Sequence, residues 1–74
     1  MNNFYFWQKK NELNTYQREV RQYQARIVAL ENELITMREQ GLDTRAFECD
    51  ITQIRRHINH LNNRIHNIQS QGIR

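Results

Sequence analysis

The stretch Leu13–Met37, LNTYQREVRQYQARIVALENELITM, carries apolar residues at alternating intervals of three and four. This spacing keeps one apolar stripe on one side of an α-helix, as in the helices of coiled coils. The residues of this first seam are Leu13, Tyr16, Val20, Tyr23, Ile27, Leu30, Leu34 and Met37. The stretch therefore predicts a long helix that packs its seam against a partner helix.

A second seam with the same spacing lies in the last third of the chain. Its residues are Phe47, Ile51, Ile54, Ile58, Leu61, Ile65 and Ile68. The two seams are out of phase, because continuing the first register through Gly41 would place Thr44 and Glu48 in the core. A phase break at a glycine favours a chain that folds back on itself, and one continuous parallel coiled coil is the alternative. The prediction is an all-α, two-helix antiparallel coiled-coil hairpin.

The whole chain, residues 1–74, is expected to form this single hairpin. The expected elements are a first helix over about 4–40, a turn over 41–43 and a second helix over about 44–70. Asn2 or Asn3 is expected to cap the first helix, and Gly41 to end it in the left-handed conformation of a Schellman motif. Asp43 or Thr44 is expected to cap the second helix, and the last residues of the chain are expected to fray.

A lone hairpin of this size leaves part of its seam uncovered. The chain has 74 residues, no proline and two glycines, and so small a helical domain buries little surface. Val28 and Ile35 lie one heptad apart beside the first seam and widen its apolar face. We expect them to face a second subunit or a partner protein rather than flank the internal core. Dimerisation or a partner protein is expected to complete a four-helix bundle.

Charge is divided along the chain into three blocks. Residues 1–30 carry a balance of +3, residues 31–50 a balance of −4 and residues 51–74 a balance of +4. Folding back gives the hairpin an acidic turn and a basic open end, which orients an antiparallel dimer or steers an acidic partner. Ordinary solvated helix faces are the alternative. The basic residues expected to steer are Lys9, Lys10, Arg18, Arg55, Arg56 and Arg64.

Four consecutive aromatic residues begin the first helix. They are Phe4, Tyr5, Phe6 and Trp7, and we call them the aromatic tip. Neighbouring residues of a helix point about 100° apart, so the four cannot all face one side. The register of the seams leaves the tip beyond the end of the second helix, where we expect it to anchor a partner or a second copy. Packing on Ile68 and Ile73, a membrane surface and stacked nucleic-acid bases are the alternatives.

No catalytic or metal-binding pattern is recognisable. His57, His60 and His66 lack the four-residue spacing of a helical metal pair, and Cys49 has no second cysteine beside it. We therefore expect no metal, no cofactor and no enzymatic activity. The single cysteine favours a reducing, cytoplasmic compartment, and neither a signal peptide nor an apolar run of about 20 residues is recognisable.

The expected function is protein binding without catalysis. A small adaptor, an inhibitor or a co-chaperone would bind its partner through the aromatic tip and through the face of Val28 and Ile35. The alternative is a nucleic-acid-binding regulator that uses the basic open end of a dimeric hairpin. Attachment to a membrane surface is a third hypothesis, and no small-molecule substrate is expected.

Overall fold

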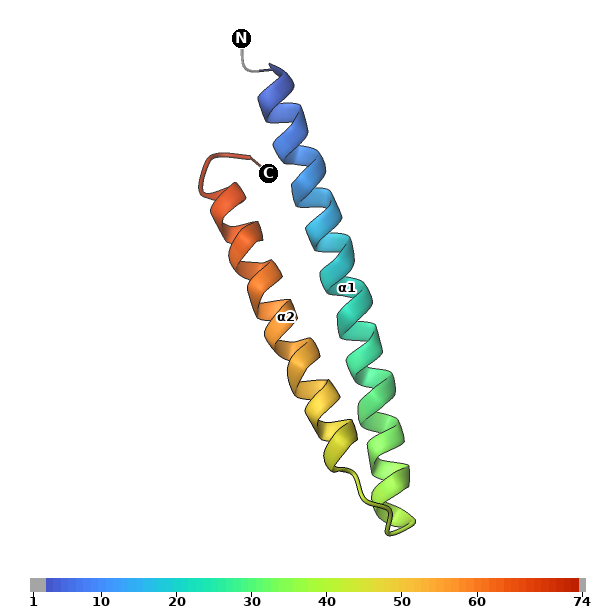
Figure 1. Cartoon of the computed structure of the whole chain (residues 1–74). Coiled ribbons are helices and arrows are strands. Elements are labelled where there is room, and N and C mark those ends of the chain that lie inside the picture. The colour runs from blue at the N-terminus through green and yellow to red at the C-terminus, as the bar shows by residue number, and fades with distance from the viewer. Residues whose placement is uncertain (1–2, 74) are drawn as a thin grey trace.

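The computed structural model describes residues 3–73, which form two α-helices and a short connection. Helix α1 spans Asn3–Glu39 and helix α2 spans Arg45–Gln69, so each bound lies one residue from the predicted one. The two helices run antiparallel, side by side, from the turn to the end of α2 (Figure 1). The predicted helical hairpin is confirmed, and the continuous coiled coil is wrong. Asn3 lies inside α1 and so is not its N-cap, whereas Asn2 lies outside the described residues.

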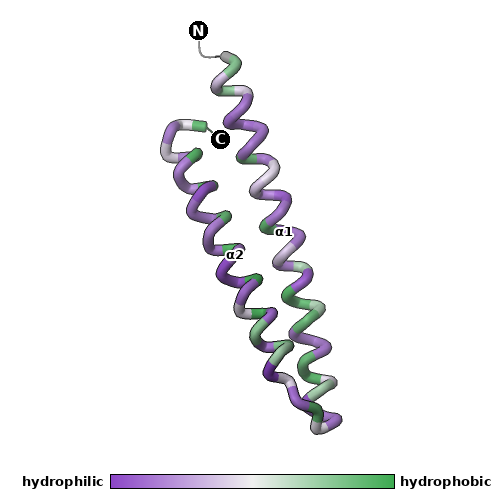
Figure 2. The backbone as a smooth tube through the Cα atoms, viewed as in Figure 1, coloured by the Kyte–Doolittle hydropathy of each residue, from purple (hydrophilic) through white to green (hydrophobic). Residues whose placement is uncertain are grey.

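The two seams face each other along the hairpin. The seam residues with buried side chains are Leu13, Val20, Ile27, Leu34, Ile51, Ile58, Leu61 and Ile68, and the other seven are half-buried. Val20, Ile27, Ile58 and Leu61 form a central cluster, and Leu13 and Ile68 belong to a second cluster at the open end. Figure 2 shows α2 as largely hydrophilic with short hydrophobic segments, and α1 as more hydrophobic in the half near the turn. The core is therefore a narrow strip between the helices.

The turn begins with the predicted Schellman motif. Gly41 has a φ of +71°, in the left-handed region that glycine adopts most readily. The Leu42 N–H donates to the Met37 carbonyl and the Gly41 N–H donates to the Arg38 carbonyl, both at 3.0 Å. These are the two hydrogen bonds that define the motif. The chain direction therefore reverses immediately after α1.

Two polar side chains begin α2. Thr44 occupies the N-cap position, but its hydroxyl donates to the Glu48 carboxylate at 2.9 Å instead of accepting from the backbone. The Asp43 carboxylate accepts the Arg45 N–H at 3.1 Å and also binds the Arg45 guanidinium at 2.9 Å. Asp43 therefore satisfies a free N–H group of the first turn, a role that helix-capping carboxylates commonly perform.

The Asp43 contacts predict an acid-sensitive helix start. The hydrogen bonds from Arg45 hold the pKa of Asp43 below its ordinary value of 3.8. A carboxylate whose pKa is lower in the folded state stabilises the fold above pH 3.8. This stabilisation is lost as the pH falls through the lowered pKa, because the carboxylate becomes protonated. We expect thermal stability to fall between about pH 4 and pH 2 less steeply in Asp43→Asn than in the wild type. Circular dichroism melts of both proteins at each pH measure this difference.

The last described residues fold back onto α1 instead of fraying. Gly72 has a φ of +88°, and the chain after α2 bends toward α1 in a hook (Figure 1). This bend buries Ile73, which is 3% exposed, against Leu13 and Ile68. The expectation of a frayed end is wrong, because one isoleucine after a glycine can cover the apolar surface that the end of α2 leaves open.

The hook makes a measurable contribution to stability. Burying an isoleucine side chain stabilises by roughly 1.5–3 kcal/mol, and ordering the residues of the hook offsets part of this gain. We therefore expect Ile73→Ala to lower the free energy of unfolding by about 1–2 kcal/mol. Urea unfolding followed by circular dichroism measures the change. Leu42→Ala, at an exposed apolar position in the turn, is the matched control, and an equal loss there would contradict a specific role for the hook.

Candidate interaction surfaces

The aromatic tip projects beyond the end of α2. Helix α1 has 37 residues and α2 has 25, so α1 extends past the hook at the open end (Figure 1). The tip residues Phe4, Tyr5, Phe6 and Trp7 are 73%, 49%, 51% and 61% exposed. The alternative in which they plug the open end is wrong, because Ile68 and Ile73 pack on Leu13. The predicted tip residues therefore form an exposed aromatic cluster.

Tyr5 differs from its neighbours in leaning toward the end of α2. Its hydroxyl lies 3.4 Å from the Oε1 of Gln71, and the Lys9 ammonium lies 5.6 Å from its ring centroid. A cation near an aromatic face contributes about 0.5–1 kcal/mol at an exposed site. Glu12, 3.2 Å from the Lys9 ammonium, raises the pKa of Lys9 by a hydrogen bond and by its charge. These contacts orient the base of the tip and leave Phe4 and Trp7 in solvent.

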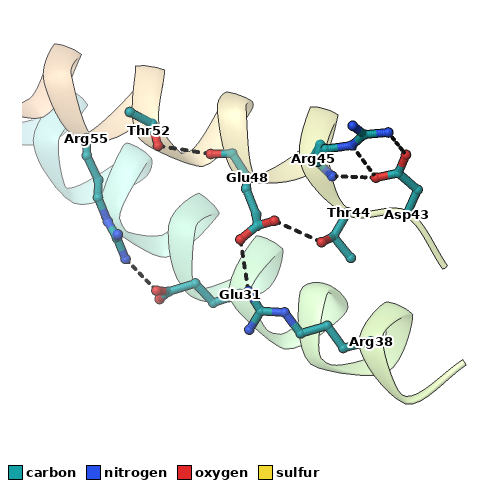
Figure 3. Close-up of polar contacts among 8 residues, drawn as sticks. All are labelled: Glu31, Arg38, Asp43, Thr44, Arg45, Glu48, Thr52 and Arg55. Carbon is teal, nitrogen blue, oxygen red and sulfur yellow. Dashed lines mark hydrogen bonds and ion pairs between the residues drawn. The ribbon is translucent and has the colours of Figure 1, made fainter. Parts of the chain in front are cut away.

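Val28 and Ile35 lie on the outside of α1, as predicted, and are 58% and 54% exposed. Glu31 falls between them, three residues after Val28 and four before Ile35, so the three share one helix face. The Glu31 carboxylate binds the Arg55 guanidinium of α2 (Figure 3). The two apolar side chains therefore flank a charged contact between the helices.

A second ion pair extends this side of the hairpin toward the turn. Arg38 of α1 binds the Glu48 carboxylate at 2.9 Å, and Glu48 also accepts the Thr44 hydroxyl (Figure 3). We call the side formed by Glu31, Arg38, Glu48 and Arg55 the ion-paired side. Exposed pairs of this kind contribute about 0–1 kcal/mol each. Their main consequence is that four charges on this side neutralise one another within the chain.

The other side of the helix pair is an open groove with a volume of about 510 Å³. Its lining residues are Tyr23, Arg26, Leu30, Asp50, Gln53, Ile54 and His57. The Tyr23 and His57 rings meet edge to face across it, with centroids 4.9 Å apart. Toward the open end, Arg64 lies over the Tyr16 ring and donates to its hydroxyl at 3.2 Å. We call this surface, from Tyr16 to Leu30 on α1 and from Asp50 to Arg64 on α2, the open side.

Three of the six predicted steering residues make contacts within the chain. Lys9 and Arg55 bind acidic side chains of the same chain, and Arg64 packs on Tyr16. Lys10 is half-buried, and the side chains of Arg18 and Arg56 are exposed.

The open side was not predicted from the sequence. A signal was present, because Tyr16, Tyr23 and Leu30 recur there at seven-residue intervals and are half-buried residues of the first seam.

The described residues offer no arrangement suited to a metal ion. Within residues 3–73, no three histidine, cysteine or acidic side chains lie close enough together to hold one. Cys49 is exposed and unpaired. Neither α1 nor α2 contains an apolar stretch long enough to cross a lipid bilayer.

Comparisons with known proteins give no relative from which a function could be transferred. No model of a protein family matches the chain, and neither a curated protein nor a solved structure matches it. A functional conclusion must therefore come from the surfaces described above.

Proposed function

We propose that this hairpin is a non-enzymatic protein–protein interaction module. The observation that supports this most directly is the aromatic tip, four exposed aromatic residues projecting beyond the end of α2. Exposed apolar clusters mark interaction sites, and aromatic residues are frequent anchors of protein interfaces. The tip binds a pocket on the partner, and Val28 and Ile35 provide a second contact along α1.

The hairpin acts in this proposal as an adaptor, an inhibitor or a co-chaperone in the cytoplasm. The single, unpaired Cys49 is compatible with a reducing compartment. Two helices cover only part of their seam, and seven seam residues remain half-buried. Helices from a second subunit or from the partner cover them, and the assembly becomes a four-helix bundle.

Capture from the cell of origin tests the proposal. A tagged full chain is compared with a variant in which Phe4, Phe6 and Trp7 are serine, and recovered proteins are identified by mass spectrometry. We expect at least one protein to be retained by the full chain and lost from the variant. The control replaces Gln8, Asn11 and Asn14, which are exposed polar residues of the same helix, by serine. Equal recovery by all three baits would refute a role for the tip.

The part of the chain from Ile51 to the hook supports nucleic-acid binding as a second candidate. Within residues 51–73 the charged side chains at neutral pH are Arg55, Arg56 and Arg64, and none is acidic. Binding through phosphate contacts weakens steeply as salt increases. Retention of a random single-stranded RNA is measured between low and physiological salt. Binding that is lost across this range and weakened by Arg56→Gln supports the second candidate, and no retention at low salt excludes it.

A further inference from the structure

The open side carries four charged groups that do not neutralise one another within the chain. Among residues 3–73, the ion pairs join Lys9 to Glu12, Arg38 to Glu48, Arg45 to Asp43 and Arg55 to Glu31. Glu19, Arg26, Asp50 and Arg64 belong to none of these pairs. All four line the grooves of the open side. Two acids and two bases on one surface therefore remain available to a binding partner.

These charges are arranged symmetrically about one level of the hairpin. Glu19 and Arg26 lie seven residues apart on α1, and their midpoint falls between Gln22 and Tyr23. On α2, Asp50 and Arg64 lie fourteen residues apart.

The midpoint of the α2 pair is His57. Tyr23 and His57 are the residues whose rings touch across the groove, at 4.9 Å between centroids. The midpoints on the two helices are therefore at the same height along the hairpin. On each helix, one acidic and one basic residue lie on opposite sides of this height, at about equal distances from it.

We propose that the open side binds a second copy of this chain, face to face and antiparallel, about a two-fold axis at the height of Tyr23 and His57. Such an interface is isologous, so each contact occurs twice. Each Glu19 faces Arg26 of the other copy, and each Asp50 faces its Arg64. This inference depends on the proposed completion of a bundle and does not depend on the aromatic tip.

The same axis pairs the half-buried seam residues of α1. Tyr16 and Leu30 lie seven residues on either side of Tyr23, so Tyr16 meets Leu30 of the other copy and the two Tyr23 rings meet at the centre. Two like-charge contacts also form, because each Glu12 faces Glu33 of the other copy. The Lys9 ammonium, 3.2 Å from Glu12, offsets that repulsion. The dimer therefore covers apolar surface that the single hairpin leaves half-exposed.

The charge of the two ends disfavours the parallel arrangement on the same face. Residues 31–50 around the turn carry a balance of −4, whereas both flanking blocks are basic. A dimer with both turns at one end would place two acidic turns together, and the antiparallel dimer places each turn beside a basic open end. In the antiparallel bundle the two aromatic tips lie at opposite ends, and Val28 remains on the outside.

Charge reversal with rescue tests the interface. We expect sedimentation equilibrium at micromolar concentration to give twice the chain mass of 9.1 kDa for the wild type. Glu19→Arg or Arg26→Glu alone creates two like-charge contacts and lowers the association constant by about tenfold or more. The double variant recreates the pairs in reverse and restores the dimer. Glu39→Arg and Arg21→Glu make the same changes in net charge away from the open side and leave the mass unchanged.

Spin-label distances test the orientation. In a Cys49→Ser background, a label at His57 lies near the axis and gives a short distance between copies. A label at Asn67 lies ten residues from the axis, so the antiparallel dimer separates two such labels by about 30 Å along the helices. Equal, short distances at both positions would overturn the antiparallel arrangement, and a monomeric wild type would overturn the dimer. Neither result affects the capture experiment, whose outcome depends on the tip.

Discussion

Replacing Leu13 by alanine is expected to lower the free energy of unfolding by about 2–5 kcal/mol. Leu13 has the most deeply buried side chain of the described residues, with 1% of its surface exposed. It contacts Ile68 of α2 and Ile73 of the hook, so it joins the helix pair to the last described residues. Truncation removes the buried atoms and leaves a cavity that the neighbours fill only in part.

This loss is large for so small a chain. At 0.05–0.15 kcal/mol per residue, a domain of this length is stable by roughly 4–11 kcal/mol. Urea unfolding of Leu13→Ala and the wild type, at one protein concentration, measures the difference. Val28→Ala, on the exposed outer face of α1, is the control and should change stability by no more than about 0.5 kcal/mol. Equal stabilities of wild type and Leu13→Ala would mean that the open end is not packed as described.

Leu13 also determines how the aromatic tip is held. The tip begins about two and a half helical turns before Leu13, where α1 is no longer covered by α2 (Figure 1). Loss of the Leu13 contacts allows the end of α1 to fray, since helix termini without tertiary contacts open most easily. Amide hydrogen exchange in residues 4–12 should therefore accelerate in Leu13→Ala, while exchange in the central cluster around Leu61 changes less.

The hairpin was predictable because two independent features of the sequence agree. The seam period specifies helices, and the phase break at Gly41 specifies where the chain reverses. The positive φ of Gly41 and the two hydrogen bonds donated by the Gly41 and Leu42 N–H groups confirm that reasoning. The hook was not predictable, because a single apolar residue after Gly72 has no periodic neighbours to indicate that it is buried.

The exposed tip could be predicted from the sequence, whereas the open side could not. Exposure of the tip follows from the lengths of two helices, which the seams fix to within a residue or two. The position of the open side depends on which flank of the helix pair carries the ion pairs, and the Glu31–Arg55 contact joins residues 24 positions apart. Pairing them requires the register of α1 against α2, which periodicity alone leaves uncertain by half a heptad.

Replacing Phe4, Phe6 and Trp7 by serine is expected to weaken binding to the captured partner by at least about 100-fold. Each buried aromatic anchor of an interface contributes on the order of 2 kcal/mol, which is roughly 30-fold in affinity. Loss of two anchors therefore weakens binding by more than about 100-fold. The hairpin itself should be unaffected, because these side chains are exposed and lie outside both core clusters. Circular dichroism and the sedimentation mass should therefore match those of the wild type.

Isothermal titration with the purified partner measures the effect, and Trp7, the single tryptophan of the chain, adds an independent signal. In the free protein its emission should be that of an indole in water, because its side chain is 61% exposed. Addition of the partner should shift the emission to shorter wavelength, and addition of anionic vesicles or RNA should not. The pair Val28→Ser and Ile35→Ser removes apolar surface from the side of α1 and should weaken binding less than the tip variant. If the tip variant bound the partner as tightly as the wild type, the interaction site would lie on the outer face of α1 instead. The groove of the open side would not be available, because the second copy occupies it in the proposed dimer.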